Sequence, residues 1–283
     1  MIDLHTHTTA SDGSLSPTQL LAHAKEVGLS ALAVTDHDTV GGVAEAKAAG
    51  KEQGIEVIAG CELSTGVGKQ SMHIVGLFLP DNPTTLQESL DFVLDARMNR
   101  NQRIVDKLNE FGVDITLDEI KAEAQGTVGR PHFAKVLLAK GVVNSIQQAF
   151  DIWIGNEGKA YIPRTRLTPA QAIDILKAEG ATPVLAHPYI LGLKPHEMDA
   201  LVAELAGLGL EGIEAYYTEH SDAQTEQYKG LAKKYGLVIS GGSDFHGTPK
   251  PHVLLGKGRG GLRVPDQVLV NLKAHRQAKG LPI

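Results

Sequence analysis

The sequence has a single cysteine, Cys61, among 283 residues, so it contains no intrachain disulfide framework and fits a reducing compartment. It also lacks an apolar run long enough to span a membrane. No basic segment followed by an apolar segment precedes the first strand-like residues, so we expect no secretory signal. These features predict a cytoplasmic protein without a membrane partner.

Basic residues are in deficit as well. Lysine and arginine total 27 against 33 aspartates and glutamates, which gives a formal net charge of −6 at pH 7. This charge argues against a broad nucleic-acid-binding face, so we expect no stable nucleic-acid complex. It remains compatible with a phosphorylated small molecule, because bound divalent metals would reverse the local charge. The composition points to no particular oligomeric state.

Strand-like apolar runs alternate with helix signals in both end regions of the chain. Ser16-Pro17-Thr18-Gln19 has the pattern of a capped helix N-terminus, and Thr168-Pro169-Ala170-Gln171 repeats it. Each predicted helix ends near a glycine. The strand-like runs cover residues 31–35, 55–63, 71–79, 182–186, 212–217 and 237–240. This alternation predicts right-handed crossovers and a mostly parallel sheet.

The middle of the chain shows a different pattern of signals. Residues 84–165 carry mainly helical signals, at about 86–111, 117–124, 131–140 and 145–153. We therefore expect two parts of one barrel, 1–83 and 166–283, separated by a helical insertion (cap) domain at 84–165.

Histidines and carboxylates recur at or near the ends of the predicted strands. His5 and His7 are two apart on a strand and face the same way, and Asp12 follows in a turn of glycine and serine, an arrangement that can bind a metal. A histidine taken alone is more often a core or surface residue, but this joint pattern is improbable by chance. In a closed parallel barrel the carboxyl ends of the strands converge on one face. The candidate ligands are His5, His7, Asp12, His37, Glu62, His73, His187, Asp244 and His246.

These motifs resemble the signature of the PHP (polymerase and histidinol phosphatase) superfamily. They are His5-Thr6-His7 with Asp12, Thr35-Asp36-His37, Glu62, His73, His187 and Ser243-Asp244-Phe245-His246. The resemblance implies an α/β fold, a distorted (β/α)7 TIM-like barrel with a small helical insertion, which holds up to three divalent metals. By that resemblance the first metal is held by His5, His7, Glu62 and Asp244. The second is held by Glu62, His73 and His187, and the third by Asp12, His37 and His246.

The expected chemistry follows from the donor atoms. Imidazoles and carboxylates without a thiolate suit Mn²⁺, our first expectation, with Fe, Zn or Mg as alternatives. A hydroxide held between metals is a nucleophile at neutral pH, and the metals neutralise phosphate oxygens. We expect phosphate-ester hydrolysis with Asp12, His37, Glu62 and His246 as the catalytic residues.

Other polar residues near these motifs have more ordinary interpretations. Ser11, Ser14 and Ser243 lie in no G-x-S-x-G elbow and are expected to be turn residues. Cys61 neighbours Glu62 on a strand and should point away from the metals. Three carboxylates could either orient a metal-binding imidazole or cap a turn: Asp3, Asp36 and Asp38. Five histidines without ligand spacing are expected not to bind metal: His23, His196, His220, His252 and His275.

The insertion carries Gly129-Arg130-Pro131-His132 and, at its end, Pro163-Arg164. Pro131 suits the first turn of a helix, whose N-terminus favours an anion, and an arginine fork suits phosphate. Each arginine has the alternative of a salt bridge. We expect Arg130, His132, Lys135 and Arg164 to bind a substrate phosphate.

This second pattern resembles the stand-alone PHP phosphatases of nucleoside 3′,5′-bisphosphates, a subgroup that includes enzymes trimming short RNA from the 5′ end. The resemblance implies hydrolysis of the 3′-phosphate of a compound such as pAp to a nucleoside 5′-monophosphate and phosphate. Short RNA oligonucleotides are further candidate substrates for 5′–3′ trimming. One alternative is a histidinol-phosphate phosphatase, which needs only one phosphate site. The other is a non-catalytic accessory module of the kind attached to DNA polymerases.

Overall fold

The structure is a computed structural model, which describes residues 1–283 except 68–69, 125–127 and 164–165. The chain divides into two compact units. The first unit consists of Met1–Leu90 and Arg166–Ile283, and the second consists of Asp91–Thr165. No helix within the described residues is long and apolar enough to cross a membrane.

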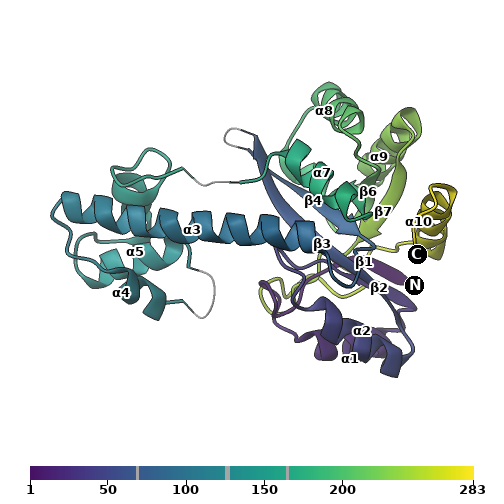
Figure 1. Cartoon of the computed structure of the whole chain (residues 1–283), viewed down its shortest axis with the longest axis horizontal. Coiled ribbons are helices and arrows are strands. Elements are labelled where there is room, and N and C mark those ends of the chain that lie inside the picture. The colour runs from purple at the N-terminus through teal and green to yellow at the C-terminus, as the bar shows by residue number, and fades with distance from the viewer. Residues whose placement is uncertain (68–69, 125–127, 164–165) are drawn as a thin grey trace. The chain divides into compact units, whose positions relative to one another are not determined.

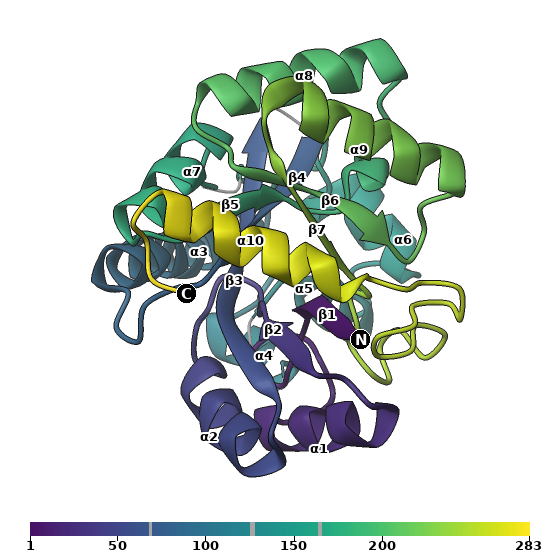
Figure 2. The same ribbon diagram turned by 90° about the vertical axis from the view of Figure 1, so that its right-hand side faces the viewer.

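The first unit contains one seven-stranded sheet whose strands follow one another in chain order (Figures 1 and 2). The two outer strands approach each other, because Asp244 N–H donates to His5 O and His7 N–H donates to Phe245 O, both at 2.9 Å. The sheet is therefore a nearly closed, distorted TIM-like barrel, and the predicted fold is confirmed. The strands are β1 (Ile2–Thr6), β2 (Ala31–Val34), β3 (Glu56–Val67), β4 (Gln70–Leu77), β5 (Thr182–Leu185), β6 (Gly212–Tyr217) and β7 (Val238–Gly242).

Strand β4 runs against both of its neighbours. It pairs antiparallel with β3 and with β5, whereas the other paired strands are parallel. Strand β3 ends at Val67 and β4 begins at Gln70, too close for a crossover, so this pair is a hairpin. His73 therefore lies near the start of its strand and pairs with Ser64 of β3, past Glu62. The reversed direction brings His73, which the sequence already placed near the start of its strand, to the edge where the parallel strands end.

Helices surround the strands on the outside of the barrel (Figure 2). Ser16 accepts the N–H of Gln19 and Thr168 accepts that of Gln171, so both predicted capping boxes are present. The cluster that attaches the first two helices to β2 includes Leu20, Leu21 and Leu32, and such buried side chains contribute about 1.5–3 kcal/mol each. The helices are α1 (Pro17–Val27), α2 (Val43–Gln53), α7 (Pro169–Ala178), α8 (Pro195–Gly207), α9 (Asp222–Tyr235) and α10 (Asp266–Ala278).

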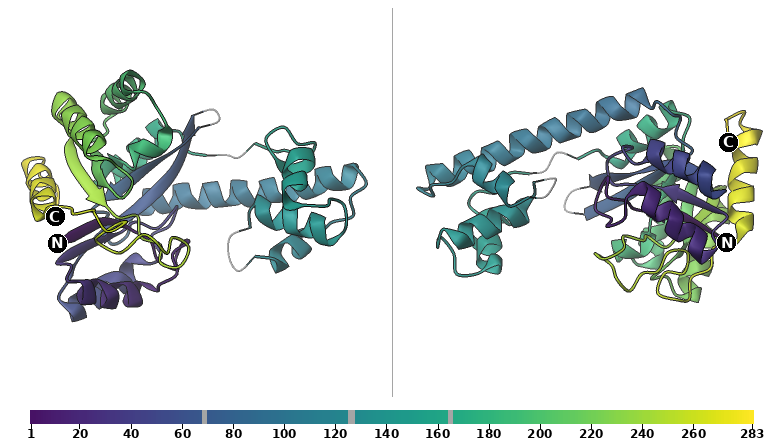
Figure 3. Two further views of the ribbon diagram at one scale, coloured as in Figure 1. Left: turned by 180° about the vertical axis from the view of Figure 1, so that it is seen from behind. Right: turned by 90° about the horizontal axis from the view of Figure 1, so that it is seen from below.

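The second unit is helical in its described part. Helix α3 (Thr84–Glu110) begins at the predicted start of the insertion, while the compact unit begins at Asp91 within this helix. The short helices of this unit lie beside α3 (Figures 1 and 3). The apolar core of the unit joins them to α3 through residues such as Leu108, Phe133 and Leu137. The predicted helix at 145–153 is instead a four-residue α-helix and a π-helical turn. The further elements are α4 (Leu117–Ala122), α5 (Arg130–Ala139), α6 (Ile146–Ala149) and the π-helix η1 (Phe150–Ile154).

Gly242 should be required for closure of the barrel. A Cβ added there would lie 2.4 Å from both the Cβ and the backbone nitrogen of His5, so β1 would have to move away from β7. We expect Gly242→Ala to lower the free energy of unfolding by about 1–3 kcal/mol, measured by urea denaturation. The control is Gly261→Ala, where an added Cβ has no heavy atom within 4 Å. Equal stabilities of the two variants would contradict this role.

Candidate metal centre

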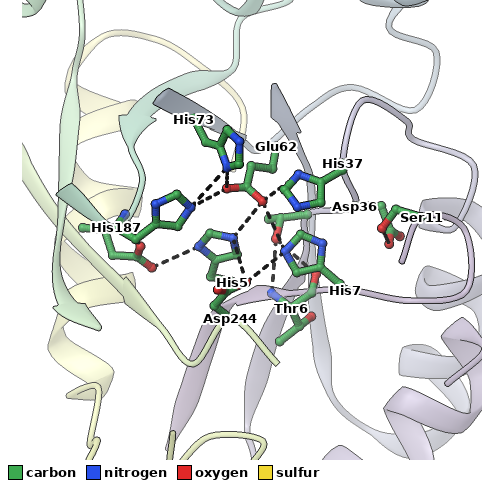
Figure 4. A network of polar contacts seen from close by, with 12 residues as sticks. His5, Thr6, His7, Ser11, Asp36, His37, Glu62, His73, His187 and Asp244 are labelled. Atoms are coloured by element: carbon green, nitrogen blue, oxygen red, sulfur yellow. Dashed lines mark hydrogen bonds and ion pairs between the residues drawn. The ribbon is translucent and has the colours of Figure 1, made fainter. Parts of the chain in front are cut away.

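The carboxylate of Glu62, on β3, lies at the middle of a cluster formed by the predicted metal ligands (Figure 4). The side chain is fully buried. Each of its oxygens faces imidazole nitrogens from neighbouring strands or the segments that follow them. The distances from Oε2 are 3.2 Å to His5 Nε2, 3.2 Å to His7 Nε2 and 3.1 Å to His37 Nδ1, and those from Oε1 are 2.9 Å to His73 Nδ1 and 2.8 Å to His187 Nε2.

Asp244 and Asp12 extend the cluster on the side of His7. Asp244 Oδ1 is 3.3 Å from His7 Nε2 and 3.4 Å from His246 Nδ1. Asp12 Oδ1 is 3.3 Å from His246 Nε2, and its Oδ2 is 3.9 Å from His37 Nε2. Asp12 is 55% exposed, whereas Asp244 and His246 are buried. This side of the cluster therefore opens to solvent.

Two of these residues have unusual backbone angles. His187 and Asp244 follow β5 and β7, and their φ angles are 27° and 58°. Positive φ is unfavourable for residues with a Cβ, and such strain concentrates at functional sites. The chain therefore turns sharply at the end of both strands, where it places these side chains in the cluster.

The cluster keeps its carboxylates charged. Burial would raise the pKa of Glu62, but the surrounding imidazoles, His5 and His37 first, hold it well below its ordinary value. Burial would also raise the pKa of Asp244, and His7 and His5 lower it instead. Burial would lower the pKa of His7, yet Asp244 and Glu62 raise it to about 9. Burial, assisted by His7 and His73, lowers the pKa of His37 to about 4.

Several buried polar atoms in the cluster lack a hydrogen-bond partner. They are His5 Nε2, both ring nitrogens of His7, His37 Nδ1 and Glu62 Oε2, each close to an opposite group but outside hydrogen-bond geometry. An unpaired buried polar atom costs about 1–3 kcal/mol, so a set of them at one point is not expected in a purely structural cluster. Divalent metals would bind these donors. The residues therefore fit a metal centre.

All nine predicted ligands come together in overlapping groups, within each of which one donor atom per residue lies within 4.8 Å of the others. Glu62 occurs in two groups and His7 in two. The groups are His5 with His7 and Asp244; His5 with Glu62 and His187; His37 with Glu62 and His73; and His7 with Asp12, His37 and His246. His5 therefore also lies close to His187, and His37 lies close to His73. These two neighbours are the histidines expected at the second metal.

Sequence reasoning missed Glu214, which supports two candidate ligands. It is 2% exposed, its Oε1 lies 3.2 Å from His5 Nδ1, and its Oε2 accepts the N–H of His187 at 2.7 Å. A carboxylate inside the buried strand Gly212–Tyr217 could have been noticed, because a buried charge requires a partner. Tyr217 and Lys250 were missed too. Both donate to Asp244 Oδ2, at 3.0 Å and 2.7 Å.

Asp3, Asp36 and Asp38, which could either orient an imidazole or cap a turn, mainly fix loops. Asp3 accepts the N–H groups of Ser243 and Gly256, both at 2.8 Å, and the hydroxyl of Ser243. Asp36 accepts the hydroxyl of Ser11 at 2.6 Å (Figure 4), and it also accepts the N–H of Thr8 at 2.7 Å. The contacts of both carboxylates thus favour the turn-capping alternative. In the same way, Asp38 accepts the N–H of Ser64 at 2.8 Å, and Ser14 Oγ accepts the N–H of Thr248 at 2.9 Å.

The residues expected not to bind metal lie outside the candidate groups of the described chain. His23 contacts Glu26, His220 contacts the carbonyl of Ala215, and His275 contacts Glu211. His196 and His252 are exposed. Cys61 is fully buried, and burial raises the pKa of its thiol.

Arg130 is bound within the second unit. Its Nη1 donates to Ile154 O at 3.2 Å and to Asn156 Oδ1 at 3.0 Å, and its guanidinium lies 5.9 Å from the ring centroids of Phe150 and Tyr161. A carbonyl, an amide oxygen and two aromatic rings carry no net charge, so these contacts leave the positive charge of Arg130 uncompensated. His132 Nδ1 accepts the N–H of Gly129 at 2.9 Å, and Lys135 is exposed. Arg164 lies outside the described residues.

Residues 3–154 match the PHP domain family. The chain belongs to the PHP family. A 5′–3′ exoribonuclease of Haemophilus influenzae is 36% identical over 255 residues, which is 90% of this chain and 93% of that protein. A 3′,5′-nucleoside bisphosphate phosphatase of Chromobacterium violaceum is 30% identical over 87% of both chains. A crystal structure from Bifidobacterium adolescentis, described as that of a metal-dependent phosphoesterase, has a TM-score of 0.72 at 29% identity and covers 96% of this chain and 95% of that one. This PHP protein is accordingly a hydrolase of the metal-dependent phosphoesterase class.

Glu214 should hold two of the predicted metal ligands, His5 and His187, in place. We expect Glu214→Gln to weaken metal binding about tenfold to hundredfold, because the amide cannot replace both carboxylate contacts, to His5 Nδ1 and to the N–H of His187. Titration of metal-free protein with Mn²⁺ measures this. Glu62→Gln should lose more affinity, and the exposed Glu52→Gln should bind like the wild type. Unchanged affinity in Glu214→Gln would contradict the role.

Proposed function

We propose that the protein removes the 3′-phosphate from nucleoside 3′,5′-bisphosphates such as pAp, giving a nucleoside 5′-monophosphate and phosphate. The observation that carries the proposal is the convergence of nitrogen and oxygen donors on Glu62, with buried atoms that only an additional ligand would satisfy. The likeness to the Chromobacterium violaceum bisphosphate phosphatase supports the substrate. The likeness to the Haemophilus influenzae exoribonuclease supports trimming of short RNA from the 5′ end as a second activity of the same site.

Divalent metals at this site would activate a water molecule and neutralise phosphate oxygens, and Mn²⁺ is our first choice. We assign them to the predicted ligands, with Glu62 shared between two of up to three positions. Asp12, His37, Glu62 and His246 are the proposed catalytic residues. Glu62 and Asp244 stay negatively charged and so attract cations, while the lowered pKa of His37 keeps its ring neutral and able to bind a metal at neutral pH.

A cavity of about 140 Å³ adjoins the ligand cluster and could admit the phosphate ester. Five candidate ligands form one part of its wall, and other residues form the rest. The lining residues are His37, Glu62, His73, His187 and Asp244, with Ser71, Met72, Ile190, Leu191 and Lys250.

The second phosphate of the substrate is assigned to the insertion. Arg130 stands in the first turn of α5, where free N–H groups and the helix dipole favour an anion, and its hydrogen bonds to Ile154 and Asn156 are to neutral groups. We propose that Arg130, His132, Lys135 and Arg164 bind the phosphate that is not cleaved. A histidinol-phosphate phosphatase would have no use for such a second phosphate site.

The substrate assignment can be tested on the purified protein loaded with Mn²⁺. We expect kcat/KM to be higher for pAp than for 3′-AMP or histidinol phosphate, because binding of the remote phosphate also positions the reacting one. Removal of metal with a chelator, verified by metal analysis, should abolish hydrolysis. A higher kcat/KM for histidinol phosphate would favour that alternative, and no hydrolysis of any phosphate ester would favour an accessory module.

Arg130 should discriminate between bisphosphate and monophosphate substrates. A charge-assisted contact contributes about 1.5–3 kcal/mol, so Arg130→Ala should lower kcat/KM for pAp about tenfold to hundredfold. The loss on 3′-AMP should be much smaller, because that substrate lacks the remote phosphate. Lys121→Ala, an exposed lysine of α4, is the control. Equal losses on both substrates would mean that Arg130 serves the fold of the second unit.

A further inference from the structure

We propose that Lys250 binds the phosphate group that is cleaved, as a fixed cation at the cavity beside the metal ligands. The inference rests on the proposed phosphoesterase function and deepens it. It concerns a residue outside the predicted ligand motifs, in the loop that follows Asp244 and His246.

The backbone around Lys250 is restricted. Pro249 and Pro251 flank it, and proline fixes its own φ and limits the residue before it. The N–H of Lys250 donates to Gly247 O at 3.1 Å, and its carbonyl accepts the N–H of Val253 at 2.9 Å. The lysine therefore starts from a well-defined position, which lowers the entropy that it loses when it binds a ligand.

The side chain of Lys250 reaches the cavity. Its Nζ lies 2.7 Å from Asp244 Oδ2, and the side chain remains 39% exposed. Asp244 Oδ2 also accepts the hydroxyl of Tyr217, while Oδ1 faces His7 and His246. An ammonium group has three donors, and this contact uses one. The other two can therefore serve a ligand in the cavity.

The charges of the wall determine where a phosphate would go. Among the described lining residues, Lys250 supplies an ammonium group, while Glu62 and Asp244 supply carboxylates. A phosphate dianion that enters between two carboxylates requires cations on more than one side. Met72, Ile190 and Leu191 add an apolar part to the wall, which suits the organic group of an ester and not its phosphate. The phosphate is thus expected on the Lys250 side.

A competing account is that Lys250 only holds Asp244 in position. The two accounts predict different effects of replacing Lys250. A positioning lysine would affect the metal, whereas a phosphate-binding lysine would affect the anion with the metals still bound. The experiment therefore measures metal content and phosphate affinity on the same samples.

The test compares the wild type with Lys250→Met and Lys250→Arg, all loaded with Mn²⁺, and uses inorganic phosphate as the probe in calorimetry. We expect Lys250→Met to retain its metal and to bind phosphate about tenfold to hundredfold more weakly. Lys250→Arg should lose less, because the charge remains. The matched control is Lys257→Met, an exposed lysine of the same loop that does not line the cavity.

Three results would overturn the inference. Equal phosphate affinity in the wild type and Lys250→Met would remove it while leaving the proposed function intact. Loss of metal from Lys250→Met, with normal phosphate affinity at saturating Mn²⁺, would make Lys250 a positioning residue for Asp244. Absence of phosphate binding by the metal-loaded wild type would overturn both the inference and the proposed function.

Discussion

The buried carboxylate of Glu62 is the constraint around which the first unit is arranged. Five imidazole nitrogens lie within 3.2 Å of its two oxygens, and they come from four separate parts of the chain, because His5 and His7 are neighbours. A buried charge with so many close donors is tolerated only if cations or protons compensate it. Closure of the barrel creates the site for such a cation, because it brings the imidazoles from different strands to one point around the carboxylate. Because these polar side chains occupy this end of the barrel, a dry apolar core cannot form there.

A second set of carboxylates fixes the segments that carry the imidazoles. Asp3 links β1 to the loop after β7, Asp36 links the end of β2 to the turn after His7, and Glu214 links His5 to the backbone of His187. Each contact joins segments that are adjacent in space but distant in sequence. The precision of the cluster therefore depends on buried hydrogen bonds between loops as well as on the sheet.

Local signals in the sequence predicted much of this structure. The Ser16 and Thr168 capping boxes depend only on residues three apart, and the His5–His7 pair depends on strand periodicity. The direction of β4 had a signal that was not used, because only seven residues separate the runs 55–63 and 71–79, and a parallel crossover needs about a dozen or more. Glu214 and Lys250 escaped notice because their partners are set by tertiary contacts. For Arg130, the sequence indicated a helix N-terminus but not the contacts to Ile154 and Asn156.

The reversed strand β4 also bears on the order in which the chain folds. Glu62 and His73 are 11 residues apart and meet across one hairpin, so this pair has a small loop-closure cost. His5 and Glu214 are 209 residues apart, and Asp3 and Ser243 are 240 apart. These distant pairs form only when the first and last strands meet. We therefore expect the hairpin to form before the barrel closes, and the set of candidate ligands to be complete only at that closure.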